Sequence, residues 1–197
     1  MSRKKTIVIS QPMLFPWVGL FEQICLADVF IFYDDVQFSK GSFTNRVQLK
    51  CEKGSEWMTI PLKKFHLGQN INEILVSEHT DWRRKHLNDL ERCYGQAEYF
   101  EEMFALVKSV YSIKSNSLSE ITIASMKAVC EYFELSWGKV FITASENGFK
   151  SKSSERVLDY VLFFEGARYV TGHGAKNYLN HESFVKNSVD VQYMDYE

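Results

Sequence analysis

Apolar and polar positions in the first part of the chain predict a strand, a helix and a second strand. Residues 7–9 form a short apolar run that suits a strand buried on both faces, and residues 10–12 end it abruptly. Apolar side chains then recur at helical spacing over residues 17–24, with Pro16 near the expected first turn. Residues 29–33 form another apolar run, which predicts a second buried strand.

The middle of the chain has a different pattern. Residues 46–50 and 57–62 predict an antiparallel hairpin, and residues 71–77 predict a further strand. Three helices are expected next: one that Thr80 caps and Gly95 ends, one through residues 103–110, and one that starts at the capping-box pair Ser117 and Glu120 and ends near Phe133.

Alternation of strands and helices returns after this helical block. The expected elements are a strand at 139–142, a helix at 153–165, a strand at 168–171, a helical piece at 175–187 and a strand at 189–194. Such alternation indicates a parallel sheet with right-handed crossovers. We therefore predict an α/β fold with a mostly parallel sheet that resembles Rossmann-like or nucleotidylyl-transferase-like sheets. A single domain over residues 1–197 is expected, with 6–45 and 136–197 as the α/β core and 46–135 as an inserted hairpin and helical cap.

Composition narrows the class of protein. The chain is 45% hydrophobic and 15% aromatic, which is enough for one domain with a sizeable core. No apolar run approaches the roughly 20 residues of a membrane helix, and the N-terminus leads into a strand, so a cytoplasmic protein without a membrane partner is expected. A formal net charge of −2 offers no overall attraction to nucleic acid.

The cysteines and histidines suggest structural roles. Cys25, Cys51, Cys93 and Cys130 lie far apart without a C-x-x-C pair, which predicts buried free thiols, and Cys25 is expected to be inert inside a helix. His86 lies on an apolar helical stripe and is expected to be a packing histidine. We assign no residue to a metal site.

Polar loops after the predicted strands are the candidate site, because ligands of open parallel sheets bind beyond the carboxyl ends of strands. The first loop precedes a helix whose N-terminal amides can bind an anion, and Gln11 is the favoured contact, with Ser10 and Trp17 beside it. The alternative is that Pro12, Pro16 and Trp17 only turn the chain and pack the helix against the core.

Asp34 and Asp35 close the second predicted strand and are the candidate catalytic residues. A carboxylate there could accept a proton from an attacking amine or hydroxyl, or bind a divalent cation. The polar residues that follow are candidate substrate contacts: Gln37, Lys40, Ser42, Asn45 and Arg46. Arg46 suits a bidentate phosphate or carboxylate contact. The alternative is a solvated loop in which Lys40 or Arg46 pairs with an acid.

A late glycine loop adds a third set of candidates. Gly172 and Gly174 permit close approach of a phosphate to the backbone, and Lys176 adds charge, although a strand–helix junction can need glycine for structure alone. Ser145 and Glu146 fall on the same predicted edge, and Lys152, Ser154 and Arg156 are further candidates. We predict that Gln11, Asp34 and Lys176 converge on one edge of the sheet.

Several short motifs together resemble one protein family. They are Gln11-Pro12, Pro16-Trp17-x-Gly19, the run from Asp28 to Lys40, Ser42-Phe43, Asn45-Arg46 and the run from Gly172 to Leu179. This set is similar to the WbqC-like family from about residue 6 to the C-terminus. Members are encoded among bacterial surface-polysaccharide (O-antigen) biosynthesis genes. The resemblance implies modification of an activated sugar, with glycyl or other aminoacyl transfer to an amino sugar as a proposed activity.

The expected function is therefore an enzyme of surface-glycan biosynthesis that transfers an aminoacyl or acyl group to a nucleotide-linked amino sugar. Its expected partners are that sugar and an acyl or aminoacyl donor. No nucleic acid partner is expected unless the donor is an aminoacyl-tRNA. The cofactor stays open, with ATP and Mg²⁺ as candidates. Two alternatives are ATP-dependent adenylation or nucleotidylyl transfer, and a non-catalytic assembly factor that binds a sugar nucleotide.

Overall fold

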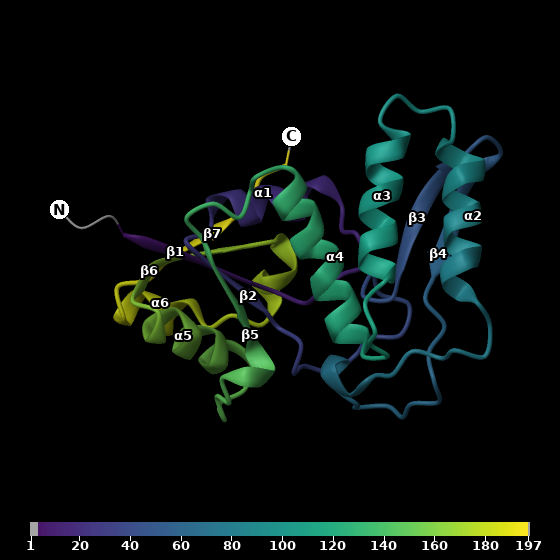
Figure 1. Ribbon diagram of the computed structural model, residues 1–197. Coiled ribbons are helices and arrows are strands. Elements are labelled where there is room, and N and C mark those ends of the chain that lie inside the picture. Colours follow the sequence, from purple (N-terminus) through teal and green to yellow (C-terminus); the bar gives the residue numbers. More distant parts are fainter. Residues whose placement is uncertain (1–3, 197) are drawn as a thin grey trace. The chain divides into compact units, whose positions relative to one another are not determined.

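The computed structural model describes residues 4–196, and within them the chain forms six α-helices, a five-stranded parallel sheet and a two-stranded antiparallel hairpin (Figure 1). The chain divides into two compact units. Unit 1 takes in residues 4–11, Trp17–Tyr33 and 134–196. Unit 2 takes in Pro12–Pro16 and Asp34–Phe133.

Unit 1 is built on the parallel sheet. Its strands are β1 (Lys5–Ser10), β2 (Val29–Phe32), β5 (Val140–Thr143), β6 (Gly166–Thr171) and β7 (Asp190–Tyr193). They pair in the order β5-β2-β1-β6-β7, and every pairing is parallel. The predicted α/β class is confirmed, because short runs of consecutive apolar residues formed strands that are buried on both faces.

Helices cover both faces of this sheet. They are α1 (Val18–Leu26), α5 (Ser153–Phe163) and α6 (His181–Lys186), with short 3₁₀ helices η2 (Ala144–Glu146) and η3 (His173–Asn177). Figure 1 shows α1 on one face and α5 with α6 on the other. On the second face, Val157 and Val161 of α5 join the same core as Ile7 and Ile31.

The helical piece predicted at 175–187 is wrong as one element. It is divided into η3 and α6, because Asn180 lies between them and caps α6 by accepting a hydrogen bond from the Ser183 amide at 3.3 Å.

The first residue of β6 has no room for a side chain. A β-carbon on Gly166 would lie 2.4 Å from Cγ1 of Ile7 and 3.0 Å from the carbonyl oxygen of Val161. Both neighbours are buried core residues that cannot move freely. This glycine therefore allows α5 to pack closely against the sheet.

We expect Gly166→Ala to lower the free energy of unfolding by about 1–3 kcal/mol, because the added methyl group overpacks a closed core. The measurement is thermal denaturation followed by circular dichroism. The matched control is Gly172→Ala, since a β-carbon there would meet no described atom within 4 Å. Equal melting temperatures for wild type and Gly166→Ala would contradict the packing argument.

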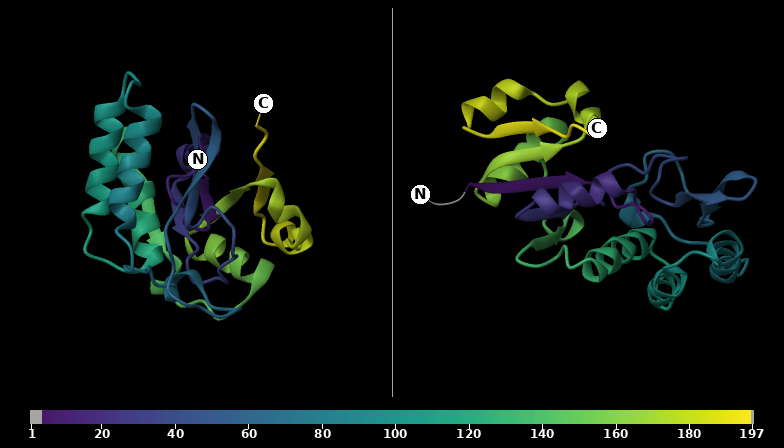
Figure 2. Two further views of the ribbon diagram at one scale, coloured as in Figure 1. Left: turned by 90° about the vertical axis from the view of Figure 1, so that its right-hand side faces the viewer. Right: turned by 90° about the horizontal axis from the view of Figure 1, so that it is seen from above.

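Unit 2 combines the hairpin with three helices. The strands are β3 (Arg46–Cys51) and β4 (Gly54–Thr59), and the helices are α2 (Trp82–Tyr94), α3 (Phe100–Tyr111) and α4 (Leu118–Tyr132), with a 3₁₀ helix η1 (Ile71–Glu73). Figure 2 shows the hairpin and the helices from two further sides. The three predicted helices are confirmed. Asp81 rather than Thr80 caps α2, through a 3.1 Å hydrogen bond from the Arg84 amide.

Two details of the predicted strands are corrected. The hairpin exists, but Cys51 pairs with Gly54, so the turn is tighter than predicted and β4 begins earlier than residue 57. Gly54 makes this turn possible with a φ of +121°. The predicted strand at 71–77 is wrong: its start is the 3₁₀ helix η1, and Leu75 and Val76 form only isolated bridges. Asn70 and Glu73 form a capping box that favours the helical turn.

The prediction of four buried free thiols is also wrong. Cys51 of β3 and Cys93 of α2 form a disulfide with 4.8 Å between their Cα atoms. Cys25 lies on α1 as expected but is exposed, whereas Cys130 is buried, as predicted, and is not part of a disulfide. The pairing could not be predicted from spacing, because packing of α2 against the hairpin joins positions 42 residues apart.

His86 is the packing histidine that the sequence predicts. It is buried on α2, its Nε2 lies 3.0 Å from the carbonyl oxygen of Thr59, and its Nδ1 lies 2.8 Å from the hydroxyl of Tyr111. A neutral ring with the proton on Nε2 satisfies both contacts. Burial lowers the pKa of His86 to about 4.

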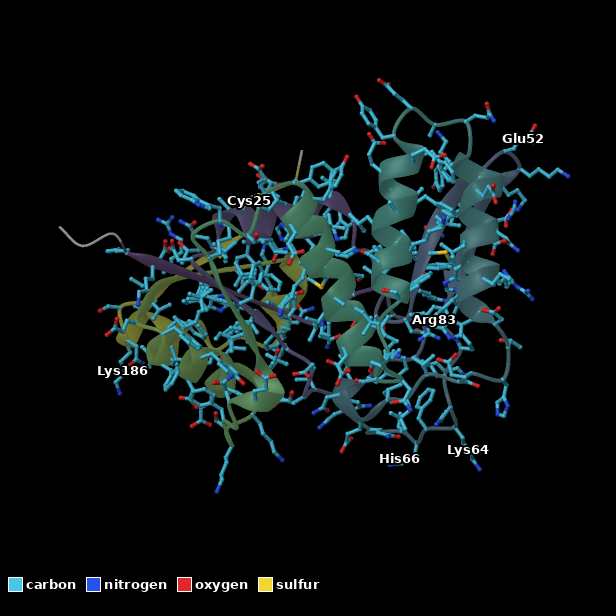
Figure 3. The ribbon with its side chains drawn as sticks, in the orientation of Figure 1. Cys25, Glu52, Lys64, His66, Arg83 and Lys186 are labelled. Carbon is cyan, nitrogen blue, oxygen red and sulfur yellow. A yellow bond between two sulfur atoms is a disulfide. The ribbon has the colours of Figure 1, made fainter. Side chains whose placement is uncertain are left out.

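Because the pKa of His86 is lower in the folded chain than the ordinary value of 6.5, its contribution to stability is present above that value and is lost as the pH falls toward 4. We expect unit 2 to lose about 2 kcal/mol of unfolding free energy between pH 7.5 and pH 5 from this group. Urea denaturation at both pH values measures it. The loss should shrink in His86→Gln and persist in His66→Gln, since His66 is exposed (Figure 3); the same loss in both variants would contradict the assignment.

Candidate functional site

The strongest candidate site lies at one edge of the unit 1 sheet. Because all five strands are parallel, their carboxyl ends lie at the same edge, which we call the carboxyl edge. Along the chain, strands are added outward from β1 to β2 and β5, and then on the other side of β1 as β6 and β7. The direction of strand addition therefore reverses between β1 and β6. Ligands of open α/β sheets bind at such a switch point.

Two of the predicted loops flank this switch point. Val8 of β1 pairs with Val170 of β6, so Ser10 and Gly172 each lie two residues beyond that pair. Gln11 follows Ser10, and Lys176 lies in η3, directly after β6. The structure thus places Gln11 and Lys176 beyond the carboxyl ends of neighbouring strands.

The two glycines after β6 keep space open at the switch point. Gly172 has an ordinary φ of −78°, and Gly174 is absent from the glycines with positive φ in the described chain. Apart from the adjoining backbone and the residues next to each glycine, a β-carbon on either one would meet no atom of residues 4–196 within 4 Å. Neither backbone conformation nor packing therefore requires glycine here, which is the pattern expected where a ligand approaches the backbone.

A lysine and two histidines surround the last residue of β7. Nζ of Lys176 lies 5.0 Å from the ring centroid of Tyr193, within cation–π range. The His173 ring is stacked on the same tyrosine at 6.0 Å, and Nε2 of His181 lies 2.7 Å from its hydroxyl. Burial raises the pKa of Tyr193 above its ordinary value.

A second cation reaches the carboxyl edge from the first turn of α5. The guanidinium carbon of Arg156 lies 5.3 Å from the ring centroid of Tyr33, which follows β2, and 5.9 Å from that of Tyr160. The N-terminus of α5 also follows the carboxyl end of β5 along the chain, and helix N-termini favour anions. Arg156 and Lys176 therefore give this edge two positive charges beside aromatic rings.

Trp17 has a packing contact within unit 1. Its ring lies over Gly19, where a β-carbon would come within 2.2 Å of the indole, and it contacts the Tyr196 ring at 4.7 Å. The Tyr196 hydroxyl donates to the Gly19 carbonyl at 3.1 Å and accepts from Gln23 at 2.6 Å. The Trp17-x-Gly19 motif therefore stabilises the start of α1, while 54% of Trp17 remains exposed.

The rest of the first loop belongs to unit 2. The Phe15 amide donates to Oγ of Ser125 at 3.1 Å, and the Leu14 amide donates to the Phe43 carbonyl at 3.1 Å. Leu14 is buried in the unit 2 core. These contacts favour the alternative from the sequence analysis, in which this part of the loop turns the chain and has a packing role.

Asp34 is also held within unit 2. Its side chain is 2% exposed and accepts a hydrogen bond from Oγ of Ser119 at 3.0 Å. Its backbone carbonyl accepts from the Asn72 amide at 2.9 Å. Asp35 is half-buried. The catalytic role of this pair stays a prediction.

Three other predicted contacts share a small pocket of unit 2. Lys40, Asn45 and Arg46 line a cavity of about 220 Å³. The guanidinium of Arg46 lies 4.0 Å from the Trp57 ring centroid and donates to the Gly41 carbonyl, and its Nε is buried without a hydrogen-bond partner among the described residues. Asn45 donates to the Ile60 carbonyl at 3.0 Å, which gives it a structural role in the hairpin.

The predicted site residues are thus distributed over both units. Unit 1 holds Ser10, Gln11, Trp17, Ser145, Glu146, Gly172, Gly174 and Lys176, and unit 2 holds Asp34, Asp35, Gln37, Lys40, Ser42, Asn45 and Arg46. The sequence analysis missed Tyr33, Tyr193 and His181 at the carboxyl edge. The two tyrosines could have been predicted from their positions. Each is an aromatic residue at or just after the end of a strand and before a polar loop.

Arg156 and Lys176 are the cations that would bind the phosphates of a cofactor at this edge. No group of three or more histidine, cysteine or acidic side chains is arranged for a metal ion in residues 4–196.

The sheet and its polar carboxyl edge define an α/β protein with a candidate anion site. The sequence profile of the WbqC-like protein family matches residues 11–197, so the chain belongs to this family, as its motifs predicted. It is similar to the uncharacterized protein Rv1507c of Mycobacterium tuberculosis (strain ATCC 25618 / H37Rv), with 29% identity over 197 residues, covering 98% of this chain and 83% of that protein. No solved structure matches the chain significantly. None of the helices in the described part of the chain combines the length and apolar character of a bilayer span.

Proposed function

We propose that the chain binds a nucleotide or nucleotide-linked sugar through its phosphates at the carboxyl edge of unit 1. The observation that carries this proposal is the pair of unconstrained glycines, Gly172 and Gly174, after β6 at the switch point. Arg156 and Lys176 supply positive charge at the same edge. If the five strands are numbered along the chain, their spatial order across the sheet is 3-2-1-4-5. This is the strand order of Rossmann-like, nucleotide-binding sheets.

The proposed reaction is transfer of a glycyl, other aminoacyl or acyl group to the amino sugar during O-antigen biosynthesis. The amine nitrogen forms a bond to the activated carbonyl carbon, the bond from that carbon to its leaving group breaks, and a base takes the amine proton. The protein would supply orientation and the proton acceptor. Membership of the WbqC-like family and the sequence motifs support this activity.

Asp34 and Asp35 are the proposed proton acceptors, on the sequence pattern alone. Within this proposal the chain is one WbqC-like domain in which residues 46–135 are an insertion into the α/β core. Nucleotide sugars are cytoplasmic metabolites, so we place the activity in the cytoplasm.

The test is a transfer assay read by mass spectrometry. Purified protein is mixed with a thymidine- or uridine-diphosphate amino sugar and with glycine plus ATP and Mg²⁺, glycyl-tRNA or an acyl thioester. The proposal predicts a sugar nucleotide heavier by one acyl group. Pyrophosphate release without acylated sugar would favour adenylation, and binding without any reaction would favour an assembly factor. Failure of every nucleotide to bind would reject the proposed site itself.

A further inference from the structure

A large apolar cavity lies entirely within unit 2. Its volume is about 550 Å³, and β3, β4, α2, α3 and α4 all contribute to its wall. Side chains such as Leu49, Met58, Leu90, Met103 and Val107 line it. A cavity of this size and composition is in the range of small-molecule sites. Aromatic rings, Phe15 and Phe133 among them, complete the lining, and the methionines can adapt to a flexible ligand chain.

Three contacts near Tyr94 join α2 to the hairpin and stabilise the wall of this cavity. The Cys51–Cys93 disulfide joins the end of β3 to the residue before Tyr94. The Lys50 amide donates to the Tyr94 hydroxyl at 2.8 Å, and Arg92 of α2 makes two hydrogen bonds to Glu56 of β4, at 3.1 and 2.7 Å. Such bracing holds the cavity open before a ligand arrives, which reduces the entropic cost of binding.

Amphipathic side chains mark the mouth of the cavity. Tyr99 is 64% exposed and Tyr132 is 48% exposed, and both line the cavity. A tyrosine places its ring against apolar groups and its hydroxyl in water, so the mouth suits a ligand with an apolar tail and a polar head. Exposed Glu98 and Glu131 lie next to these tyrosines in the chain and would repel a carboxylate head.

We propose that unit 2 binds an aliphatic chain of medium length that carries an uncharged polar head. The tail lies among the aliphatic and methionine side chains, and the head lies at the hydroxyls of Tyr99 and Tyr132. This site does not depend on the nucleotide site proposed for unit 1, and its test does not measure nucleotide binding or transfer.

The test is calorimetric titration of the full chain with 1-hexanol, 1-octanol and 1-decanol. Affinity is expected to rise about fourfold for each added methylene, because each buries its surface in the cavity. Decanoate is expected to bind more weakly than 1-decanol. No binding of any alcohol, or no dependence on chain length, would overturn the site, and tighter binding of decanoate would overturn the uncharged head.

A cavity-filling variant locates the binding. Leu106→Trp should reduce the affinity for 1-decanol at least tenfold, because Leu106 lines the cavity. Ala105→Trp is the matched control: it lies on the same helix, is exposed and does not line the cavity. Circular dichroism checks the fold of both variants, and Met103→Trp replaces Leu106→Trp if the latter fails to fold. Unchanged affinity in a folded cavity variant would overturn the proposal.

Discussion

Removal of the Cys51–Cys93 disulfide is expected to lower the unfolding free energy of unit 2 by about 4 kcal/mol, an effect of nearly a thousandfold on the unfolding equilibrium. The bond joins residues 42 positions apart, and a closed loop of this length strongly restricts the unfolded chain. It also fixes β3 to α2 at one end of the hairpin. The measurement is urea denaturation of Cys51→Ser under oxidising conditions, followed by circular dichroism.

The matched control for this prediction is Cys25→Ser. Cys25 is an exposed free thiol on α1 in unit 1 (Figure 3), so its replacement should leave the urea midpoint unchanged. Reduction of the wild-type protein should reproduce the loss seen in Cys51→Ser. Equal stability of the oxidised wild type and Cys51→Ser would show that the bond does not stabilise unit 2.

The double variant Arg156→Ala/Lys176→Ala is expected to weaken nucleotide binding at least about a hundredfold. Each hydrogen bond to a charged group contributes about 1.5–3 kcal/mol, and this variant removes both cations that we identify at the carboxyl edge. Calorimetric titration with ATP and with uridine-diphosphate sugars measures the change. Both side chains are at least partly exposed to solvent, so the fold should persist.

Lys186→Ala is the control for this second prediction. Lys186 is an exposed cation at the end of α6 in the same unit (Figure 3), so its loss changes the net charge of unit 1 without changing the carboxyl edge. Similar weakening in Lys186→Ala and the double variant would indicate a general charge effect. Unchanged affinity in the double variant would remove both cations from the site.

Much of the fold could be predicted from local patterns. The apolar runs at residues 7–9 and 29–33 became β1 and β2, because consecutive apolar residues suit strands buried on both faces. Ser117 starts α4 as predicted, since its hydroxyl accepts a hydrogen bond from the Glu120 amide. In each case the signal that predicted the element lies within a few residues of the sequence.

The features that could not be predicted from the sequence depend on contacts between distant residues. The disulfide joins a strand to a helix, and Leu75 and Val76 form isolated bridges with Ser117 and Leu62 in place of a strand. Asp34 shows the same limit for the site. Its position after β2 was predictable, but its burial against Ser119 of α4 was not.

The carboxyl edge was predictable because parallel strands align their ends. Gln11 and the glycine loop were therefore expected at one edge, whereas the placement of Arg156 over Tyr33 and of Lys176 over Tyr193 required tertiary structure. No pattern in the sequence associates a side chain of α5 with the residue after β2.

The most direct test of nucleotide binding at the switch point is calorimetric titration of wild type and Gly172→Leu with a uridine-diphosphate sugar. A β-carbon here would meet no described atom within 4 Å outside the two neighbouring residues, so a leucine would extend into the space that Gly172 leaves open. We expect saturable one-to-one binding by wild type and at least tenfold weaker binding by Gly172→Leu at an unchanged melting temperature. Equal affinity in both proteins, or no binding by wild type, would contradict it.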